Sequence, residues 1–593
     1  MRPVMRPVMR PVRRRGLAVA VVLLVSLLAS ACSALPRSGP VELGEGPSAT
    51  SSAAPFDFNP PGPVVGADRE EIVDGFLRAL QATPVRTQVA EEFLTADAVD
   101  SWHPVRRTIV YSGQRVVAHG PTVAVHLDGI FELDRTGRWA GATDPVDSTL
   151  HFAFAKEDGE WRITDLPDAM VIPETHFEAR YREYYLPFFD ATGSVLVPEQ
   201  VYIPWGVTAP TLLVSALLAG PKGTANAVER SYLPSGTRLG VSVPVRDGVA
   251  EVPLSHDMAE LPKDQLDLAM AQLAWTLGQV SEVKGFRVTV DGTPLDVPGG
   301  RDVVNVDAYQ EYAPWVASAS SDLFGIRDDA VVQVVGSSEL QAALLPKPLQ
   351  DPRSLGVDLA GQQLAVVPED GDRVVVLTRS ADNAPKPVVA YRGTDVLRPM
   401  WDHTGRLWFV DRRADGPVVL VEHYGRVREL RVPALAGEHV VATALSRDGT
   451  RLVAALDGGD RTGDRLVMMR VVRQASGQPV RLTRPRPMST PQPLLRVQDV
   501  GWRDPTTVAA LTRPSRTTSV VVLASADGSS GPIDLDSAID VLFERGVSLA
   551  SSPATPPALV VAARDGGVHA LDVQGRWDLD ALPAGLRLPA FVG

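Results

Sequence analysis

The sequence has 593 residues, 45% of them hydrophobic, which is enough for several domains with their own apolar cores. Its net charge is −13, and the six arginines of residues 1–31 leave 52 basic against 71 acidic residues from Cys32 onward, a net charge of −19. This excess of acid argues against nucleic acid as a partner and against charge-driven binding to anionic lipid, since both need clustered Lys and Arg. Cys32 is the only cysteine, which excludes an intrachain disulfide and a zinc site built from cysteines.

The N-terminus has the pattern of a bacterial secretion signal that ends in a lipidation site. Residues 1–31 combine a basic head with the apolar run Leu17–Ala31, which is shorter than the roughly 18 to 20 residues of a permanent membrane span. Small residues end this run at Ala31, and Cys32 follows directly. We therefore predict cleavage between Ala31 and Cys32, acylation of Cys32, and a lipid anchor on the extracytoplasmic face of the cell membrane. Paired arginines also occur in twin-arginine signals, but the residues after them favour the general secretory route.

The segment after the cysteine, residues 32–66, is predicted to be a flexible linker. It is rich in Pro, Gly, Ser and Ala and has no apolar periodicity. A flexible chain of this length has ends about 30 to 35 Å apart. The linker is therefore expected to hold the folded part of the protein away from the membrane.

Residues 67–192 are predicted to form an N-terminal α+β domain. Asp68 has the features of a helix N-cap, the apolar residues from Ile72 to Leu80 share one helical face, and a second helix is expected at about 86–94. Segments with strand-like patterns follow at 108–111, 115–118, 122–133, 150–155 and 160–163. Asp158-Gly159 joins the last two in the usual hairpin pattern. Two helices followed by a curved antiparallel sheet predict a small cone-like domain.

Residues 193–300 are predicted to form a second α+β domain, and residues 301–319 a linker after it. A helix is expected at Pro210–Leu218, with proline at its start and Gly220-Pro221 as its stop. A longer amphipathic helix is expected at Asp264–Gln279, before a closing strand at Phe286–Val290. This pattern predicts helices on one face of a small mixed sheet.

Residues 320–593 are predicted to form an all-β propeller with about six blades. Strand–turn–strand stretches recur with turn glycines at 361, 405 and 449, which are 44 residues apart, and weaker copies follow. Repeats of about 40 to 50 residues with several short strands each are typical of propeller blades. A further blade is expected around Leu323 to Val335, closed by C-terminal residues. A β-sandwich is the alternative, but a sandwich does not repeat one turn at a constant spacing.

The motifs in this order resemble one family, the actinobacterial LpqB lipoproteins. The N-terminal part carries the lipidation pattern, Ile72–Leu77 and Gly159–Ile163. The middle part resembles the GerMN module of spore-germination proteins, through Leu217–Pro221, Leu233–Thr237 and Val252–Ser255. GerMN modules usually carry an acid where this chain has Pro253, which weakens any polar site there. The resemblance implies an accessory protein that binds and modulates a membrane sensor histidine kinase of the MtrB type, with a role in cell-envelope and cell-division signalling.

The sequence contains none of the common catalytic or nucleotide-binding motifs, so we expect no enzyme activity and no cofactor. Five histidines of the N-terminal domain could suggest a metal site, but their spacing and the lack of clustered carboxylates argue against one. These histidines are His103, His119, His126, His151 and His176. Asp457, Asp460 and Asp464 could suggest calcium, but a solvated hairpin tip is the better interpretation. Trp401, Trp408 and Trp502 recur at blade positions and are expected in the core rather than on a binding surface.

The leading hypothesis is therefore a non-catalytic, lipid-anchored protein that binds the extracellular domain of a sensor histidine kinase. The alternative is a binding protein for cell-wall glycan or a small ligand. The binding residues are unknown at this level. Three places are open to a partner: the mouth of the propeller channel, the loops at its rim, and the sheet edge of the GerMN-like domain.

Overall fold

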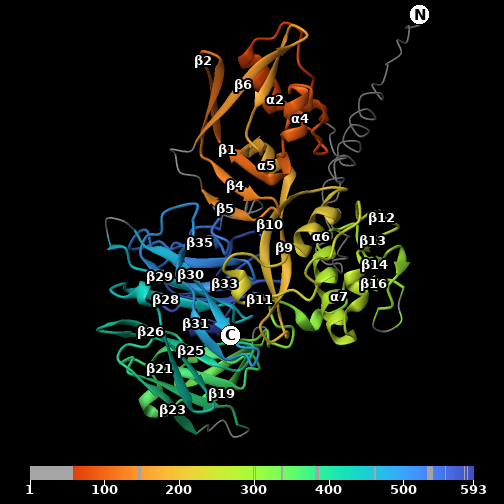
Figure 1. The fold of residues 1–593 in the computed structure, drawn as a ribbon. Coiled ribbons are helices and arrows are strands. Elements are labelled where there is room, and N and C mark those ends of the chain that lie inside the picture. The colour runs from red at the N-terminus through yellow and green to blue at the C-terminus, as the bar shows by residue number, and fades with distance from the viewer. Residues whose placement is uncertain are drawn as a thin grey trace, which may run out of the picture. The chain divides into compact units, whose positions relative to one another are not determined.

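The computed structural model describes residues 58–142, 148–297, 300, 302–335, 338–380, 386–459, 463–529, 539–554, 556–579, 581–583 and 585–593. These residues belong to one unit of the chain, 57–593, whose elements are labelled in Figure 1. The predicted signal peptide, Cys32 and most of the linker lie outside the described residues. None of the helices within the described ranges is both long and apolar enough to cross a membrane.

The first helix, α2 (Arg69–Ala79), begins where its capping pattern predicted. Asp68 Oδ1 accepts a hydrogen bond from the backbone N–H of Glu71 at 2.9 Å, and Glu71 Oε2 accepts one from the N–H of Asp68 at 2.9 Å. The helix then buries its apolar face, including Phe76, in the domain core. The helix expected at 86–94 is only four residues long, α3 (Gln88–Glu91), because the chain turns at Thr95, which caps the separate helix α4 (Ala96–Ser101).

Two four-stranded sheets complete the N-terminal domain, in the orders β5-β4-β1-β8 and β2-β3-β6-β7. The elements are β1 (Arg107–Tyr111), β2 (Gly113–His119), β3 (Thr122–Asp128), β4 (Phe131–Asp134), β5 (Trp139–Ala142), β6 (Thr149–Glu157), β7 (Glu160–Asp165), β8 (Met170–Pro173) and α5 (Glu174–Arg180). The predicted hairpin is confirmed. Asp158 and Gly159 connect β6 to β7 with φ angles of 53° and 88°, as a two-residue turn requires.

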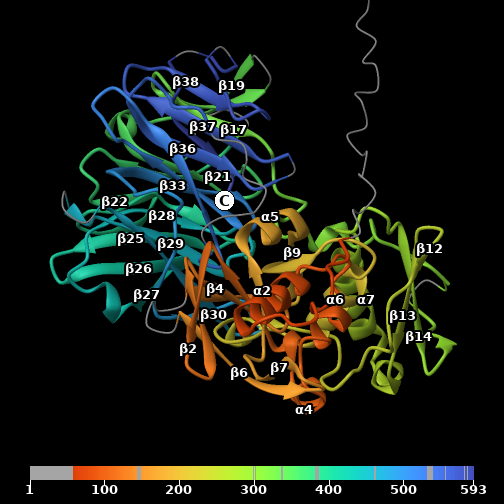
Figure 2. The ribbon, with the colours of Figure 1, turned by 90° about the horizontal axis from the view of Figure 1, so that it is seen from above.

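The middle domain has a layer of two helices between two sheets. Its elements are β9 (Tyr181–Asp190), β10 (Leu196–Pro204), α6 (Ala209–Leu218), β11 (Glu229–Arg230), β12 (Val245–Arg246), β13 (Val249–Leu254), α7 (Lys263–Leu277), β14 (Gly285–Val290), β15 (Thr293–Pro294) and β16 (Val304–Asn305). Helices α6 and α7 lie between the β9–β10 hairpin and the sheet of β12 to β14 (Figure 2). Strand β9 precedes the predicted domain boundary at residue 193 and pairs from Tyr181 to Phe189 with β10, which follows that boundary.

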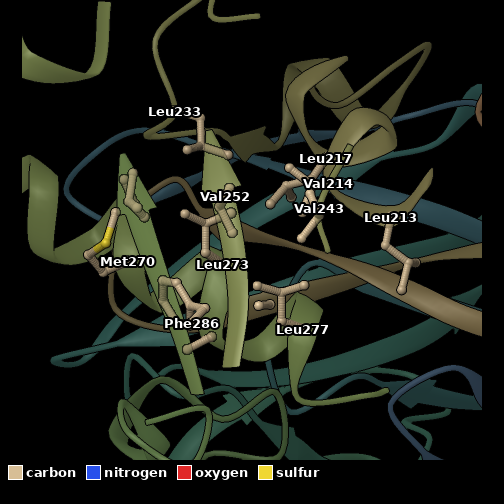
Figure 3. Close-up of a cluster of buried hydrophobic side chains, with 14 of the residues drawn as sticks. Leu213, Val214, Leu217, Leu233, Val243, Val252, Met270, Leu273, Leu277 and Phe286 are labelled. Atoms are coloured by element: carbon tan, nitrogen blue, oxygen red, sulfur yellow. The ribbon is translucent and has the colours of Figure 1, made fainter. Parts of the chain in front are cut away.

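The helices were predicted correctly because their start and stop residues are local. Helix α6 has proline in its first turn, and Gly220 follows it with a φ of 71°. Figure 3 shows the core that the two helices form with the mixed sheet, in which Leu213 and Leu217 of α6 meet Leu273 and Leu277 of α7 and the neighbouring strands. This core holds the β9–β10 hairpin rigidly against the rest of the domain.

Within the described residues, six sheets follow in chain order, and we refer to them as blades 1 to 6. Blade 1 contains β17 (Leu323–Arg327), β18 (Ala330–Val335), β19 (Ser338–Leu344) and β40 (Arg587–Phe591); blade 2 contains β20 (Pro352–Val357), β21 (Gln363–Pro368), β22 (Arg373–Thr378) and β23 (Pro387–Arg392); blade 3 contains β24 (Met400–Trp401), β25 (Leu407–Arg413), β26 (Gly416–His423) and β27 (Arg426–Arg431); blade 4 contains β28 (Val440–Leu445), β29 (Arg451–Leu456), β30 (Arg465–Arg473), β31 (Pro479–Leu482) and β32 (Arg486–Pro487); blade 5 contains β33 (Val497–Asp504), β34 (Thr507–Thr512) and β35 (Val520–Ser525); blade 6 contains β36 (Gly546–Ser552), β37 (Ala558–Ala563), β38 (Val568–Leu571) and β39 (Trp577–Asp578). The innermost strands β40, β20, β24, β28, β33 and β36 are neighbours in a closed ring. The C-terminal strand β40 pairs with β17, so the last segment of the chain completes the first blade.

The repeated turns between the first two strands of blades 2, 3 and 4 share one conformation. Gly361, Gly405 and Gly449 have φ angles of 68°, 74° and 67°. At Gly449 a side chain would also meet the guanidinium of Arg473, because a Cβ there would lie 2.6 Å from Arg473 Nη2. Glycine at this spacing is therefore a backbone requirement of the blade.

The middle domain packs on the propeller through a buried group of three charged residues. Arg470 of β30 forms ion pairs with Glu199 of β10 at 2.6 Å and with Glu229 of β11 at 2.5 Å. Burial opposes ionisation of Glu199, but Arg470 outweighs it and lowers the pKa of Glu199. Burial, and then the Glu199 carboxylate, raise the pKa of Glu229 well above its usual value. The two carboxyl groups thus differ: the environment favours ionisation of Glu199 and opposes ionisation of Glu229.

We expect Arg470→Met to destabilise the protein by about 3 to 5 kcal/mol, because removing one partner leaves a buried charge without compensation. The measurement is urea unfolding followed by tryptophan fluorescence and circular dichroism. The matched control is Arg431→Met, which removes an exposed arginine from a 3.6 Å pair with Asp415 and is expected to cost less than about 1 kcal/mol. Equal unfolding midpoints for the two variants would contradict the role given to Arg470.

Candidate functional site

The best-defined site of the sequence, the cleavage and lipidation site at Ala31 and Cys32, lies outside the described residues. It stays a prediction. Within the described residues, the candidate binding surfaces are those of the propeller and the middle domain.

Two small cavities lie on the propeller axis, one at each end of the innermost strands. The first, of about 170 Å³, is lined by residues near the beginning of these strands, including Arg353, Val441 and Ser548. The second, of about 60 Å³, is lined by residues at which they end, including Trp502 and Gly593. We call the corresponding sides of the propeller the start face and the end face.

Arg398 separates the two cavities and blocks the channel. It lines both of them, and its guanidinium donates to Asp499 Oδ2 at 2.8 Å and to the carbonyl oxygens of Val500 and Leu549 at 2.8 and 2.9 Å. Burial raises the pKa of Asp499 even though Arg398 acts in the opposite direction. A guanidinium with three fixed acceptors from blades 5 and 6 is a structural plug, so ligands have access to the mouths of the channel rather than to its centre.

Residues from outside the blades occupy the axial part of the end face. Arg447 donates to the carbonyl oxygen of Val592 at 3.0 Å, to Ser552 Oγ at 3.2 Å and to the carbonyl oxygen of Trp315 at 3.4 Å. Its guanidinium is buried, which lowers the pKa of Arg447 to about 10. The C-terminus and the segment before blade 1 are thus tied together at this mouth.

The β9–β10 hairpin covers the neighbouring part of the end face. Gln200 Nε2 donates to Ser525 Oγ at 2.6 Å, and Tyr202 Oη lies 2.8 Å from Ser529 Oγ. Asp190 Oδ2 lies 3.3 Å from His403 Nε2 of blade 3. Burial opposes ionisation of Asp190, but His403 and Thr192 outweigh it and lower the pKa of Asp190 to about 2. Together with the Glu199–Arg470 pair, these contacts join the hairpin to blades 3, 4 and 5.

The start face carries a cluster of four arginines between blades 5 and 6, which we call the arginine cluster: Arg496, Arg513, Arg545 and Arg564. Arg496 and Arg545 directly precede the innermost strands of these blades, and Arg513 and Arg564 directly follow the strands paired with them. The backbone N–H of Arg513 donates to Leu495 O, and that of Arg564 donates to Arg545 O, both at 2.9 Å. The cluster therefore belongs to the ordered rim of the start face.

The arginine cluster is a concentration of positive charge on an acidic protein. Partial burial, and then the charges of Arg545, Arg496 and Arg564, lower the pKa of Arg513. Nε of Arg545 is buried and has no hydrogen-bond partner among the described residues. Four guanidinium groups at one rim are suited to bind carboxylate or phosphate groups of a partner. Sequence reasoning missed the cluster because its members are up to 68 residues apart and no local motif joins them.

The three tryptophans lie in the core, as predicted. Trp401, Trp408 and Trp502 are 3%, 0% and 3% exposed, so they are not available to a partner. Trp408 Nε1 donates to Asp402 Oδ2 at 2.8 Å, and Trp502 Nε1 donates to the carbonyl oxygen of Ala444 at 3.3 Å.

The acidic loop of blade 4 uses its carboxylates within the fold. Asp464 accepts hydrogen bonds from the backbone N–H groups of Gly458 and Val497, at 3.2 and 2.6 Å, and Asp457 accepts one from Gly459 at 2.8 Å. Asp460 lies outside the described residues.

The histidines of the N-terminal domain that were considered for a metal site have separate environments, as His126 and His176 show. His126 Nδ1 lies 2.9 Å from Thr149 Oγ1, and burial lowers the pKa of His176 to about 4. Within the described ranges, no group of three or more His, Cys, Asp or Glu is arranged to hold a metal ion.

The sheet edge of the middle domain offers little to a partner. Its edge strand β12 is two residues long, and short edge strands resist pairing with another chain. Ser255 is engaged locally, since its hydroxyl accepts from the N–H of Arg238 at 3.0 Å and donates to Asp257 at 2.6 Å. This leaves the propeller as the main candidate surface.

Comparison with known proteins places this domain order in one family. The family model described as "Lipoprotein LpqB, N-terminal domain" matches residues 62–178, "Sporulation and spore germination" matches 184–296, and "Lipoprotein LpqB beta-propeller domain" matches 327–581. The chain belongs to the LpqB lipoprotein family. The matches also confirm the predicted fold class, a multidomain protein with a GerMN-like domain followed by a propeller.

Curated relatives from actinobacteria that bear the family name match this chain over most of their own length. A protein named Lipoprotein LpqB from Thermobifida fusca (strain YX) is 27% identical and covers 86% of this chain and 90% of its own length. A protein of the same name from Nocardia farcinica (strain IFM 10152) is 24% identical and covers 98% of this chain and 96% of its own length. Among solved structures, the first GerMN domain of the sporulation protein GerM from Bacillus subtilis is 19% identical and covers 21% of this chain and 97% of its own, with a TM-score of 0.17, which carries no argument by itself.

The contact between the hairpin and blade 5 contains a carboxyl group whose protonation should depend on folding. Glu183 Oε1 accepts from Gln200 at 2.9 Å, while Oε2 is buried without a hydrogen-bond partner among the described residues. Burial, together with nearby Asp527 and Asp504, raises the pKa of Glu183 to about 8 from the ordinary 4.5. The native state thus retains a proton that the unfolded chain releases above pH 4.5, so this group's contribution to stability is lost as the pH rises toward 8.

We expect Glu183→Gln to flatten the dependence of stability on pH between 5 and 8.5, because glutamine stays neutral throughout. The variant should be more stable than the parent at pH 8.5 and similar to it at pH 5. Urea unfolding midpoints at both pH values provide the measurement, with Glu178→Gln, an exposed glutamate of α5, as the control. Parallel pH profiles for the parent and Glu183→Gln would show that this carboxyl group does not titrate as described.

Proposed function

We propose that this protein is a lipid-anchored, extracytoplasmic and non-catalytic lipoprotein that binds the external domain of a membrane sensor histidine kinase and modulates its signalling. The anchor is supported by the signal pattern that ends at Cys32 and by the lipoprotein names of its relatives. The kinase as partner comes from the family resemblance.

The observation that carries a binding role is the unequal use of the two propeller faces. The hairpin and the C-terminus occupy the end face through buried polar contacts, whereas the start face presents a polar channel mouth and the arginine cluster. Propellers bind partners over a channel mouth or at the rim loops, because the strand edges within each blade are already paired. The start face is therefore the proposed docking surface for the kinase domain.

The anchor and the partner are tested together by crosslinking and pull-down from intact membranes. The native protein is expected to co-purify with the kinase, and Cys32→Ser is expected to leave the membrane fraction and to lose most of that crosslink. Ser33→Ala, which changes the neighbouring residue, is the matched control. Retention of Cys32→Ser in membranes would refute the anchor, and a native protein that crosslinks no kinase would refute the partner.

Charge reversal in the arginine cluster tests the docking surface. The double variant Arg513→Glu/Arg564→Glu should weaken binding of the kinase's external domain at least about tenfold, and the remaining binding should depend less on salt, because rim charges act through long-range attraction. The control Arg481→Glu/Arg576→Glu reverses two exposed arginines of the propeller that lie away from the start face. Binding constants from titration calorimetry at two ionic strengths give the measurement. Equal losses in both double variants would refute the proposed surface.

A second candidate function is binding of cell-wall glycan or another small ligand. It is favoured by a further polar cavity at the rim of blades 3 and 4, which is large enough for a small molecule.

A further inference from the structure

An open groove of about 490 Å³ lies between blades 3 and 4, and its volume is within the range of small-molecule sites. One wall is the β26–β27 hairpin, with His423, Tyr424, Arg426 and Arg428. The other wall is the turn between β30 and β31, with Ser476, Gln478 and Pro479, and Arg406 lies between the two. We call it the arginine–tyrosine groove.

Strand pairing directs the basic side chains into the groove. Arg426 pairs opposite His423, and Arg428 pairs opposite Val421, so these residues project from the same face of the hairpin. The ion pairs of β27 involve Glu429 and Arg431 on its other face. Arg426 and Arg428 form no ion pair with any described acidic residue, so both guanidinium groups are available to a ligand.

The base of the groove is held rigidly. The guanidinium of Arg406 donates to Thr404 Oγ1 and to the carbonyl oxygen of Ser476, the latter at 3.4 Å. The Oδ1 atom of Asp402 fixes this turn, accepting from the N–H groups of Thr404 and Arg406 at 2.9 and 3.1 Å. Asp402 is itself buried and paired with Arg473. A ligand therefore meets a preorganised positive charge at the base.

Tyr424 has a position that the fold alone does not explain. It is 91% exposed and has a φ of 51° in the two-residue turn Tyr424-Gly425. The equivalent turns elsewhere in the chain carry Asp158, Asp247 and Asp291 before glycine, with φ angles of 53°, 49° and 50°. Aspartate tolerates this left-handed conformation, whereas a bulky residue rarely adopts it. An exposed aromatic ring at such a cost indicates a contact surface.

His423 adds a neutral polar group beside the ring. The centroids of the His423 and Tyr424 rings are 4.0 Å apart. Burial, and then the charge of Arg406, lower the pKa of His423, so the imidazole is uncharged at pH 7. It is therefore able to exchange hydrogen bonds with hydroxyl groups, while the arginines supply the charge.

We propose that the arginine–tyrosine groove binds a short anionic oligosaccharide. A carboxylate or phosphate on the sugar is suited to the guanidinium groups of Arg426 and Arg428, and a sugar ring is suited to the face of Tyr424. Ser476 and Gln478 supply hydrogen-bonding groups for the hydroxyls. The net charge of −19 beyond the signal repels long polyanions, which limits the ligand to a short one.

An acidic peptide is the less suitable occupant. A peptide strand would add to the backbone edge of β27, whereas the groove opens on the side-chain face of that strand. On the opposite wall, strand β31 begins at Pro479, which has no N–H to offer to an added strand. The inference deepens the alternative function and does not depend on the kinase.

Titration calorimetry on the full chain, purified from membranes in detergent, tests this proposal. The probes are trigalacturonate for carboxylate, glucose 6-phosphate for phosphate, neutral maltotriose, sodium sulfate, and an acidic peptide of alternating Asp and Gly. At least one anionic sugar should bind about tenfold or more tightly than maltotriose and sulfate, and the tighter of the two identifies the anionic group. Tighter binding of the peptide or of sulfate, or equal binding of all the sugars, would overturn the proposal.

Variants locate the binding in the groove. Arg426→Gln and Arg428→Gln should each weaken binding of the preferred sugar about tenfold, since each removes a charge-assisted hydrogen bond. Tyr424→Asn keeps a residue that accepts the turn conformation, so it should weaken sugar binding without lowering the melting temperature. Arg392→Gln is the control and should bind like the parent. Unchanged affinity in both arginine variants would overturn the assignment, and because no kinase is present, the result is independent of the kinase proposal.

Discussion

The buried contact of Arg470 with Glu199 and Glu229 is the constraint on which the arrangement of the folded domains depends. The β9–β10 hairpin that supplies Glu199 packs its apolar side chains in the core of the middle domain and makes polar contacts with blades 3 to 5. Because the charges are desolvated, they stabilise only one pairing of these surfaces, and displacement would leave an unpaired ion in an apolar environment. The hairpin is thus shared between two domains and sets which side of the propeller remains accessible.

This docking gives the two propeller faces different roles. The hairpin, the C-terminus and the segment before blade 1 occupy the end face, and Arg398 blocks the channel between the faces. The surfaces left to a partner are the start face with its arginine cluster and the outer rim, where the arginine–tyrosine groove lies. Both concentrate arginine on a chain that is acidic overall, so local complementarity rather than net charge governs which anions bind.

Features with a local physical cause were predictable from the sequence. Asp68 caps its helix, Asp158-Gly159 forms a hairpin turn, and the glycines at 361, 405 and 449 fit one repeated turn, because each depends on backbone conformation within a few residues. The expected helix at 86–94 was wrong in length, since the cap at Thr95 and the pairing of Leu94 with Ile163 end it early. Propensity could not foresee that pairing, because its partner lies 69 residues later.

The lipidation pattern at Cys32, the order of the domains and the propeller repeat can be read from the chain alone, since motifs and periodicity record short-range constraints. Which charges meet depends on how the domains and blades pack. Arg470 and Glu199 are 271 residues apart, and the members of the arginine cluster come from two blades. Tyr424 combines the two cases. Its turn depends only on neighbouring residues of the chain, but the groove beside it exists only because blade 4 forms the other wall. A binding surface is a property of neighbouring blades, and neighbours across a sheet are set by packing rather than by position in the chain.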